Sequence, residues 1–130
     1  MPWVEVFAVF VICHLVGDYL LQTEWQASNK RGGLGPDPTA RRALFAHVST
    51  YTLAFVPALI WLADDIGAWV VGVAALIFVP HFVQDDGRLL RAYIARVKGV
   101  GATANSQVFL AVDQTFHLVT LFGIALLVAA

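Results

Sequence analysis

The four histidines of this chain lie in four separate hydrophobic stretches, and three of them have an aspartate four residues away. Residues four apart lie one turn apart on the same helix face, so each imidazole can act together with its carboxylate. Imidazole and carboxylate groups on adjacent turns are a common metal site in helical bundles. Ionisable side chains at membrane depth are costly and usually functional. The sets are His14 with Asp18, His47 with Tyr51, His81 with Asp85, and Asp113 with His117.

The same side chains also have a purely structural interpretation, because polar groups buried between helices can hold those helices together. For a single histidine–aspartate pair, the structural interpretation is the stronger one. Three such pairs and a further histidine, one set in each hydrophobic stretch, favour a metal or chemical site instead.

The composition indicates a membrane protein. Of the 130 residues, 59% are hydrophobic and 13% are charged, whereas a soluble domain has about 25% charged residues. A bilayer-spanning helix needs about 20 apolar residues. We therefore predict an all-α, polytopic membrane protein, one domain over 1–130, built as a four-transmembrane-helix bundle. The predicted spans are about 3–22, 42–63, 66–87 and 108–130.

The basic residues predict the orientation of this bundle. Every lysine and arginine falls within 30–42 or 88–98, the two loops that follow the first and third spans. Cytoplasmic loops carry an excess of these residues. We expect both loops on the cytoplasmic side of the inner (cytoplasmic) membrane and both termini outside. The first stretch lacks a basic segment and a small-residue cleavage site, so we interpret it as a helix rather than a cleaved signal.

Segment 88–98 is predicted to form a short basic amphipathic helix at the membrane interface. Its apolar residues repeat at helical spacing, with basic residues largely on the other side. Lys30, Arg88 and Arg91 are expected at lipid headgroups, where an anionic headgroup or a lipid-linked substrate could bind. Topology signalling alone would explain these charges equally well.

Several residues predict interruptions of the helices. Pro57 and Pro80 lie inside the second and third spans, and each can kink its helix. Segment 32–38 is rich in glycine and proline and is expected to be irregular. Thr39 is a plausible N-cap of the second span, and 99–106 is expected to be a flexible connector.

The depths of the four sets predict that they meet. Spans one and three run toward the cytoplasm, and spans two and four run away from it. The order His–Asp in spans one and three becomes Asp–His in span four, so all the sets lie just under the cytoplasmic face. One layer would contain Asp18, Asp85, Asp113 and His47. The other, roughly 6 Å deeper at 1.5 Å per residue, would contain His14, His81, His117 and Tyr51.

This set of side chains suits a divalent transition metal, with zinc preferred. The predicted ligands are His14, Asp18, His47, His81, Asp85, Asp113 and His117. They could hold one metal with carboxylates that orient the imidazoles, or two metals that share carboxylates. An aspartate that binds no metal, one of Asp18, Asp85 and Asp113, would be the catalytic base. Gln22, Tyr51 and Gln114 suit supporting hydrogen bonds, although contacts between helices would also explain the two glutamines.

The motifs resemble one family along nearly the whole chain. The run from His14 through Asp18 and Gln22 to Trp25, followed by Lys30, is similar to the opening motif of Domain of Unknown Function 3307. The later sets follow in the family's order and spacing. These relatives are small bacterial and phage membrane proteins, so the resemblance implies a helical membrane protein without implying an activity. A single His-x-x-x-Asp pattern is also similar to predicted membrane-bound metal-dependent hydrolases.

Four functions are compatible with these residues. The first is a metal-dependent hydrolase that acts on a membrane-proximal substrate from the cytoplasmic side. The second is a transporter or channel for a divalent cation or protons, although the outer halves of the spans offer no evident polar path. A haem protein and a structural or interaction protein are the others. We expect the lipid bilayer as a partner and no nucleic acid, and association of copies into a homo-oligomer stays open.

Overall fold

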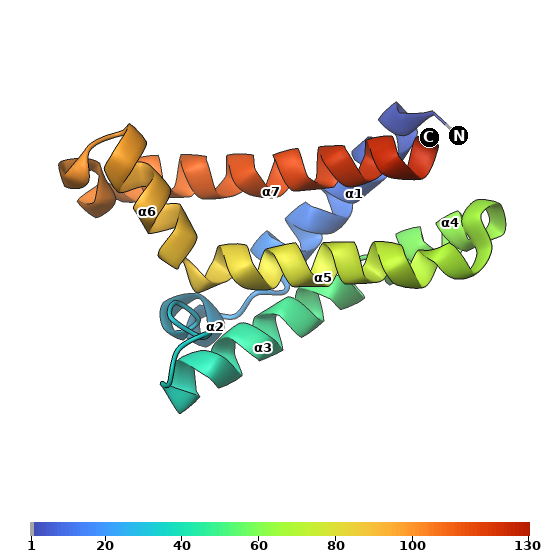
Figure 1. Ribbon diagram of the computed structural model, residues 1–130. Helices are drawn as coiled ribbons and strands as arrows, with labels where there is room; N and C mark the ends of the chain where they lie inside the picture. Colours follow the sequence, from blue (N-terminus) through green and yellow to red (C-terminus); the bar gives the residue numbers. More distant parts are fainter. Residues whose placement is uncertain (1) are drawn as a thin grey trace.

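The computed structural model describes residues 2–130, and helices with their connections make up this whole range (Figure 1). The prediction of an all-α fold is confirmed. The long helices are α1 (Trp3–Leu15), α3 (Pro38–Leu53), α4 (Val56–Ile66), α5 (Val70–Asp86), α6 (Arg88–Val97) and α7 (Ser106–Ala129). The shorter elements are the π-helical turn η1 (Val16–Leu20), α2 (Glu24–Asn29), and the 3₁₀ helices η2 (Gly67–Trp69) and η3 (Val100–Ala104).

Within residues 2–130, three helical segments are long and apolar enough to cross a membrane, which is consistent with membrane association. They are Trp3–Leu20, Val56–Asp86 and Ser106–Ala129. The second segment contains a reversal, because Gly67 adopts φ 58° and ψ −134°, a conformation that glycine reaches without steric cost. Figure 1 shows α4 and α5 running in opposite directions on either side of this turn.

The predicted span 42–63 is not one continuous helix. α3 ends at Leu53 and α4 begins at Val56. Pro57 explains the break, because it has no backbone N–H and its ring would clash with the carbonyl of Leu53 four residues earlier. Pro80, in contrast, lies inside α5 without ending it.

The start of α3 also differs from the prediction. The N-cap is Asp37, whose Oδ1 accepts a hydrogen bond of 2.9 Å from the backbone nitrogen of Thr39. Pro38 follows as the first helical residue, a position at which its missing N–H costs nothing. Thr39 is therefore the second residue of α3 rather than its N-cap.

The turn η1, which follows α1, approaches α3 closely at Gly17. A Cβ atom on this glycine would lie 2.6 Å from Cδ2 and 3.2 Å from Cα of Tyr51. The contact therefore depends on the absence of a side chain. Gly17 belongs to η1, and wide π-helical turns of this kind are frequent at functional sites. The turn carries Asp18 inward beside α3.

A short helix that residue spacing did not predict, α2, follows η1. It begins with a capping box in which the backbone nitrogen of Gln26 donates to Thr23 Oγ1 and the backbone nitrogen of Thr23 donates to Gln26 Oε1. The following loop is irregular, as expected, yet it is attached to the end of α5. The backbone nitrogens of Gly32 and Leu34 donate to the carbonyl and to Oδ1 of Asp86, each at 2.9 Å.

The predicted amphipathic segment forms α6. Gly87, with φ 84°, ends α5 and starts α6. α6 buries Leu90 and Ile94 and leaves Leu89 and Arg91 exposed. In Figure 1 this helix crosses from the end of α5 to the start of α7. The connector after it contains the 3₁₀ helix η3.

The apolar core packs four parts of the chain against one another. Its members come from α1, from α3 and α4, from α5 and from α7, and they include Phe10, Phe55, Leu62, Ile77 and Leu121. Figure 1 shows α5 and α7 roughly antiparallel, with both chain termini at one end. This packing holds the four histidine-bearing helices at a common level, where all four histidines are buried.

Candidate metal centre

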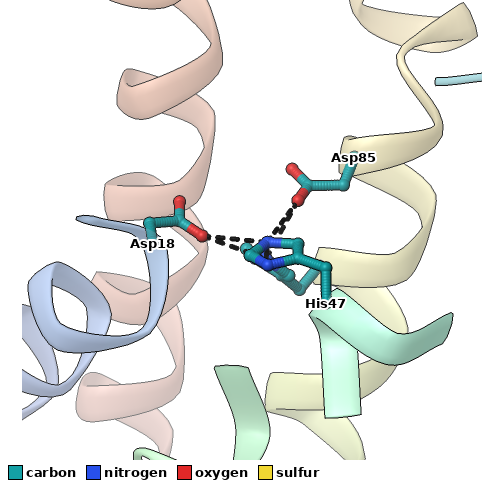
Figure 2. A group of neighbouring side chains, drawn as sticks. Asp18, His47 and Asp85 are labelled. Carbon is teal, nitrogen blue, oxygen red and sulfur yellow. Dashed lines mark hydrogen bonds and ion pairs between the residues drawn. The ribbon is translucent and has the colours of Figure 1, made fainter. Parts of the chain in front are cut away.

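Two aspartates and two histidines from three parts of the chain converge inside the bundle. η1 contributes Asp18, α3 contributes His47, and α5 contributes His81 and Asp85, and all four are buried. Each offers one ligand atom, and these atoms lie within 4.8 Å of one another. Figure 2 shows Asp18 and Asp85 approaching the His47 ring from opposite sides. We call these four residues the first ligand group.

The distances within the first ligand group are short. Nε2 of His47 lies 2.8 Å from Asp85 Oδ2 and 3.1 Å from Asp18 Oδ1. Nε2 of His81 lies 3.1 Å and 3.4 Å from the same two oxygens. The two Nε2 atoms are 3.0 Å apart. Two imidazole nitrogens and two carboxylate oxygens are a ligand set that zinc accepts.

A second ligand group shares Asp85 with the first and adds Asp113 and His117 from α7. Nε2 of His117 lies 3.1 Å from Asp85 Oδ1, the oxygen that the first group does not use. Both oxygens of Asp85 therefore face imidazole nitrogens, one in each group. A carboxylate in this position can bridge two metal ions.

The tautomer of His117 is set by its own helix. Nδ1 lies 2.6 Å from the backbone carbonyl oxygen of Asp113, so Nδ1 carries the hydrogen and donates it. The neutral ring then has a lone pair on Nε2, and this lone pair faces the Asp85 oxygen. Nε2 of His117 and Oδ1 of Asp85 would then both be acceptors, and their separation of 3.1 Å requires a proton or a cation between them. Donation of the other ring N–H to a carbonyl is the usual arrangement for a metal-ligating histidine.

Lys30 lies inside the cluster, whereas the sequence analysis placed it at the headgroup interface. Its side chain is 8% exposed, and Nζ lies 2.8 Å from Asp85 Oδ2. The helix α2 and its capping box position this residue. The pattern Thr23-x-x-Gln26, a capping-box signature, could have predicted the start of a helix here.

His14, a predicted ligand, lies beside the two groups but belongs to neither of them. Its Nε2 lies 2.8 Å from Gln114 Oε1, which can only accept, so Nε2 donates. Its Nδ1 is left to accept from the Tyr51 hydroxyl at 3.0 Å. Asp18 Oδ2 is 3.8 Å away. Both nitrogens of His14 are thus occupied by supporting side chains.

Tyr51 and Gln114 connect His14 to the ligand groups. The Tyr51 ring stacks on His81, with 3.5 Å between ring centroids and 6° between planes. The Gln114 amide nitrogen lies 3.4 Å from Asp18 Oδ2 and 3.3 Å from Asp113 Oδ2. These contacts fix the orientation of ligand side chains from outside the groups.

The remaining predicted residues lie further out. Gln22 donates to the backbone carbonyl of Asp18 at 3.2 Å and does not reach a carboxylate. Arg88 is exposed, and its Nε and Nη2 donate to Oδ2 and Oδ1 of Asp86. These hydrogen bonds raise the pKa of Arg88, so it stays charged. Arg91 is exposed as well.

Comparison with known proteins identifies a family for this chain. No curated protein and no solved structure matches it significantly. A family match does exist, and it includes every residue of both ligand groups. Residues 6–130 match the family described as "Protein of unknown function (DUF3307)", and the chain belongs to that family.

Proposed function

We propose that this protein is a membrane-embedded, metal-dependent hydrolase with a two-metal centre, with zinc as the preferred metal. The observation that carries the proposal is the position of Asp85, whose two oxygens face two different ligand groups. The first metal would be held by Asp18, His47, His81 and Asp85. The second would be held by Asp85, Asp113 and His117.

The charges of the buried cluster support metal binding. Asp18, Asp85 and Asp113 bring three negative charges and Lys30 brings one positive charge, all in buried positions. With neutral histidines, two negative charges stay uncompensated, and burial of uncompensated charge is strongly unfavourable. Divalent cations at this position would remove that cost. Protonated histidines are the alternative, and the metal content of the purified protein distinguishes the two.

Hydrolysis is the chemistry that such a centre supports best. Paired metals provide Lewis acidity and lower the pKa of water. The chain's own residues would orient the reactants and move the proton. All three aspartates would be ligands, so the base would be a carboxylate that binds metal through only one oxygen; Asp113 Oδ1, which is buried without a hydrogen-bond partner among the described residues, is suited to accept a proton in this way. Lys30 places a positive charge beside Asp85, where it would offset negative charge that develops on the substrate.

We further propose four membrane crossings, formed by α1 with η1, by α3 with α4, by α5 and by α7. The reversal at Gly67 supports separate crossings before and after it. The basic loops then lie on the cytoplasmic side of the inner membrane, with α6 in the headgroup layer and the substrate reached from that side.

Cysteine labelling tests this orientation. In a Cys13→Ala background, a cysteine replaces either Pro36 in the α2–α3 loop or Ala68 in the α4–α5 turn, both of which are exposed. An impermeant maleimide added to intact cells should label Ala68→Cys and not Pro36→Cys. Labelling of Pro36→Cys from outside would show that the orientation is inverted.

Metal stoichiometry tests the two-metal centre. Elemental mass spectrometry of the purified protein should find two metals per chain in the wild type and one in His117→Ala. His14→Ala is the matched control. It removes an equally buried imidazole that lies outside both ligand groups, so at saturating metal it should still bind two metals, with affinity lowered by no more than about 10–100-fold. Wild-type protein without stoichiometric metal, and without a gain in thermal stability from added zinc, would contradict the metal proposal.

A further inference from the structure

A pocket between α5, α6 and α7 lies against the second ligand group. Its volume is about 420 Å³, within the range of small-molecule sites. Most of its wall is aliphatic or aromatic, and Asp113 is the one carboxylate among its lining residues. The lining includes Val79, Val83, Leu89, Leu90, Asp113 and Phe116.

Asp113 connects this pocket to the metal centre. The residue is 6% exposed, and its Oδ1 has no hydrogen-bond partner among the described residues. It belongs to the second ligand group and also forms part of the pocket wall. A molecule in the pocket would therefore contact apolar side chains over most of its surface and a carboxylate of the second ligand group in the pocket wall.

The mouth of the pocket faces the surroundings of the helices. Val79 on α5 is 56% exposed and Leu89 on α6 is 67% exposed. Two of the three walls, α5 and α7, belong to segments that can cross a membrane. In the proposed arrangement, lipid chains surround this mouth, so hydrocarbon is the ligand that reaches the pocket without crossing water.

The basic side chains near the pocket indicate which class of lipid carries the hydrocarbon chain that it binds. Arg91 follows Leu89 and Leu90 of the pocket by one or two residues, and it lines a second hollow of about 360 Å³ together with Arg31. This helix thus presents apolar side chains to one hollow and a guanidinium to another. Arginine pairs with phosphate, whereas Asp113 in the pocket wall would repel the carboxylate of a free fatty acid.

We propose that the α5–α6–α7 pocket binds an acyl chain of an anionic glycerophospholipid, with the phosphate toward Arg31 and Arg91. This inference rests on the proposed function for its membrane setting, and it makes a phospholipid the substrate class of the metal centre. Binding of the chain does not itself require metal.

Photolabelling in vesicles tests the proposal. The protein is reconstituted in phosphatidylcholine with a trace of phosphatidylglycerol that carries a diazirine on its acyl chain. Peptides that contain 79–90 and 113–116 should be labelled above other lipid-facing segments, and excess unlabelled phosphatidylglycerol should suppress this labelling. Val83→Trp, which fills the pocket, should reduce labelling at these peptides by about tenfold, a 1.4 kcal/mol effect.

Val71→Trp is the matched control, because Val71 is an exposed valine on the same helix outside the pocket. It should leave the labelling unchanged. Val79→Trp at the exposed mouth is the second variant, and it keeps the test decisive if Val83→Trp does not fold. An equal signal from a phosphatidylcholine probe would overturn the assignment of an anionic headgroup.

Two further outcomes overturn acyl-chain binding itself. One is labelling spread evenly over all lipid-facing helices and insensitive to Val83→Trp. The other is absence of label from the pocket, which would indicate that another chain covers it. Metal content is measured on the same samples. Pocket labelling in protein without metal would retain this inference and reject the proposed metal centre.

Discussion

Asp85→Asn should remove both metals and all measurable hydrolysis, whereas Asp86→Asn should retain them. The two aspartates are adjacent on α5 and similarly buried, with 1% and 4% exposure. Only Asp85 faces both ligand groups. Asp86 instead binds Arg88 and the backbone of Leu34. Loss of an outer-shell partner costs about 10–100-fold in metal affinity or activity, so loss of the shared ligand should cost more than about 100-fold.

The measurement combines elemental analysis with turnover in phospholipid vesicles that contain metal-loaded protein. The wild type and Asp86→Asn should release product, and a chelator should abolish this activity. Equal metal content in Asp85→Asn and the wild type would show that Asp85 does not bridge metals. Stoichiometric metal without turnover of phospholipid or of simple ester substrates would reject hydrolysis and leave transport or a structural role as the better interpretation.

Lys30→Met should strongly destabilise the metal-free protein. Its ammonium lies 2.8 Å from Asp85 Oδ2, and both side chains are buried. Removal of one partner from a buried ion pair leaves the other charge uncompensated and costs about 3–5 kcal/mol. Bound metal would compensate the Asp85 carboxylate, so the loss of stability should be smaller in metal-loaded protein.

Denaturant unfolding in detergent micelles, followed by tryptophan fluorescence, measures this difference. Lys98→Met is the control, because Lys98 is exposed and surface substitutions usually change stability by within about 0.5 kcal/mol. If Lys30→Met and Lys98→Met unfold at the same denaturant concentration, the ion pair with Asp85 does not stabilise the fold. An equal loss of stability with and without metal would indicate that the metals do not compensate Asp85.

Much of the cluster could be predicted from the sequence, because its information is local and periodic. Spacing of four residues places an imidazole and a carboxylate on one helix face whatever the helix packs against. The reversed order of Asp113 and His117 relative to His81 and Asp85 encodes antiparallel helices at matching depth. The structure contains the corresponding contacts, since His47 lies beside Asp18 and Asp85, and Tyr51 contacts His14 and His81.

The roles of individual side chains within that cluster required the tertiary structure. Lys30 and His14 both have other roles than the sequence predicted: the lysine binds Asp85 instead of lying at the headgroups, and the histidine is held by Tyr51 and Gln114 instead of belonging to a ligand group. Periodicity specifies which face of a helix a residue occupies. Contact between residues 30 and 85, or between 14 and 114, depends instead on how a short capped helix turns inward and how helices rotate about their axes. Packing among elements distant in sequence determines those rotations.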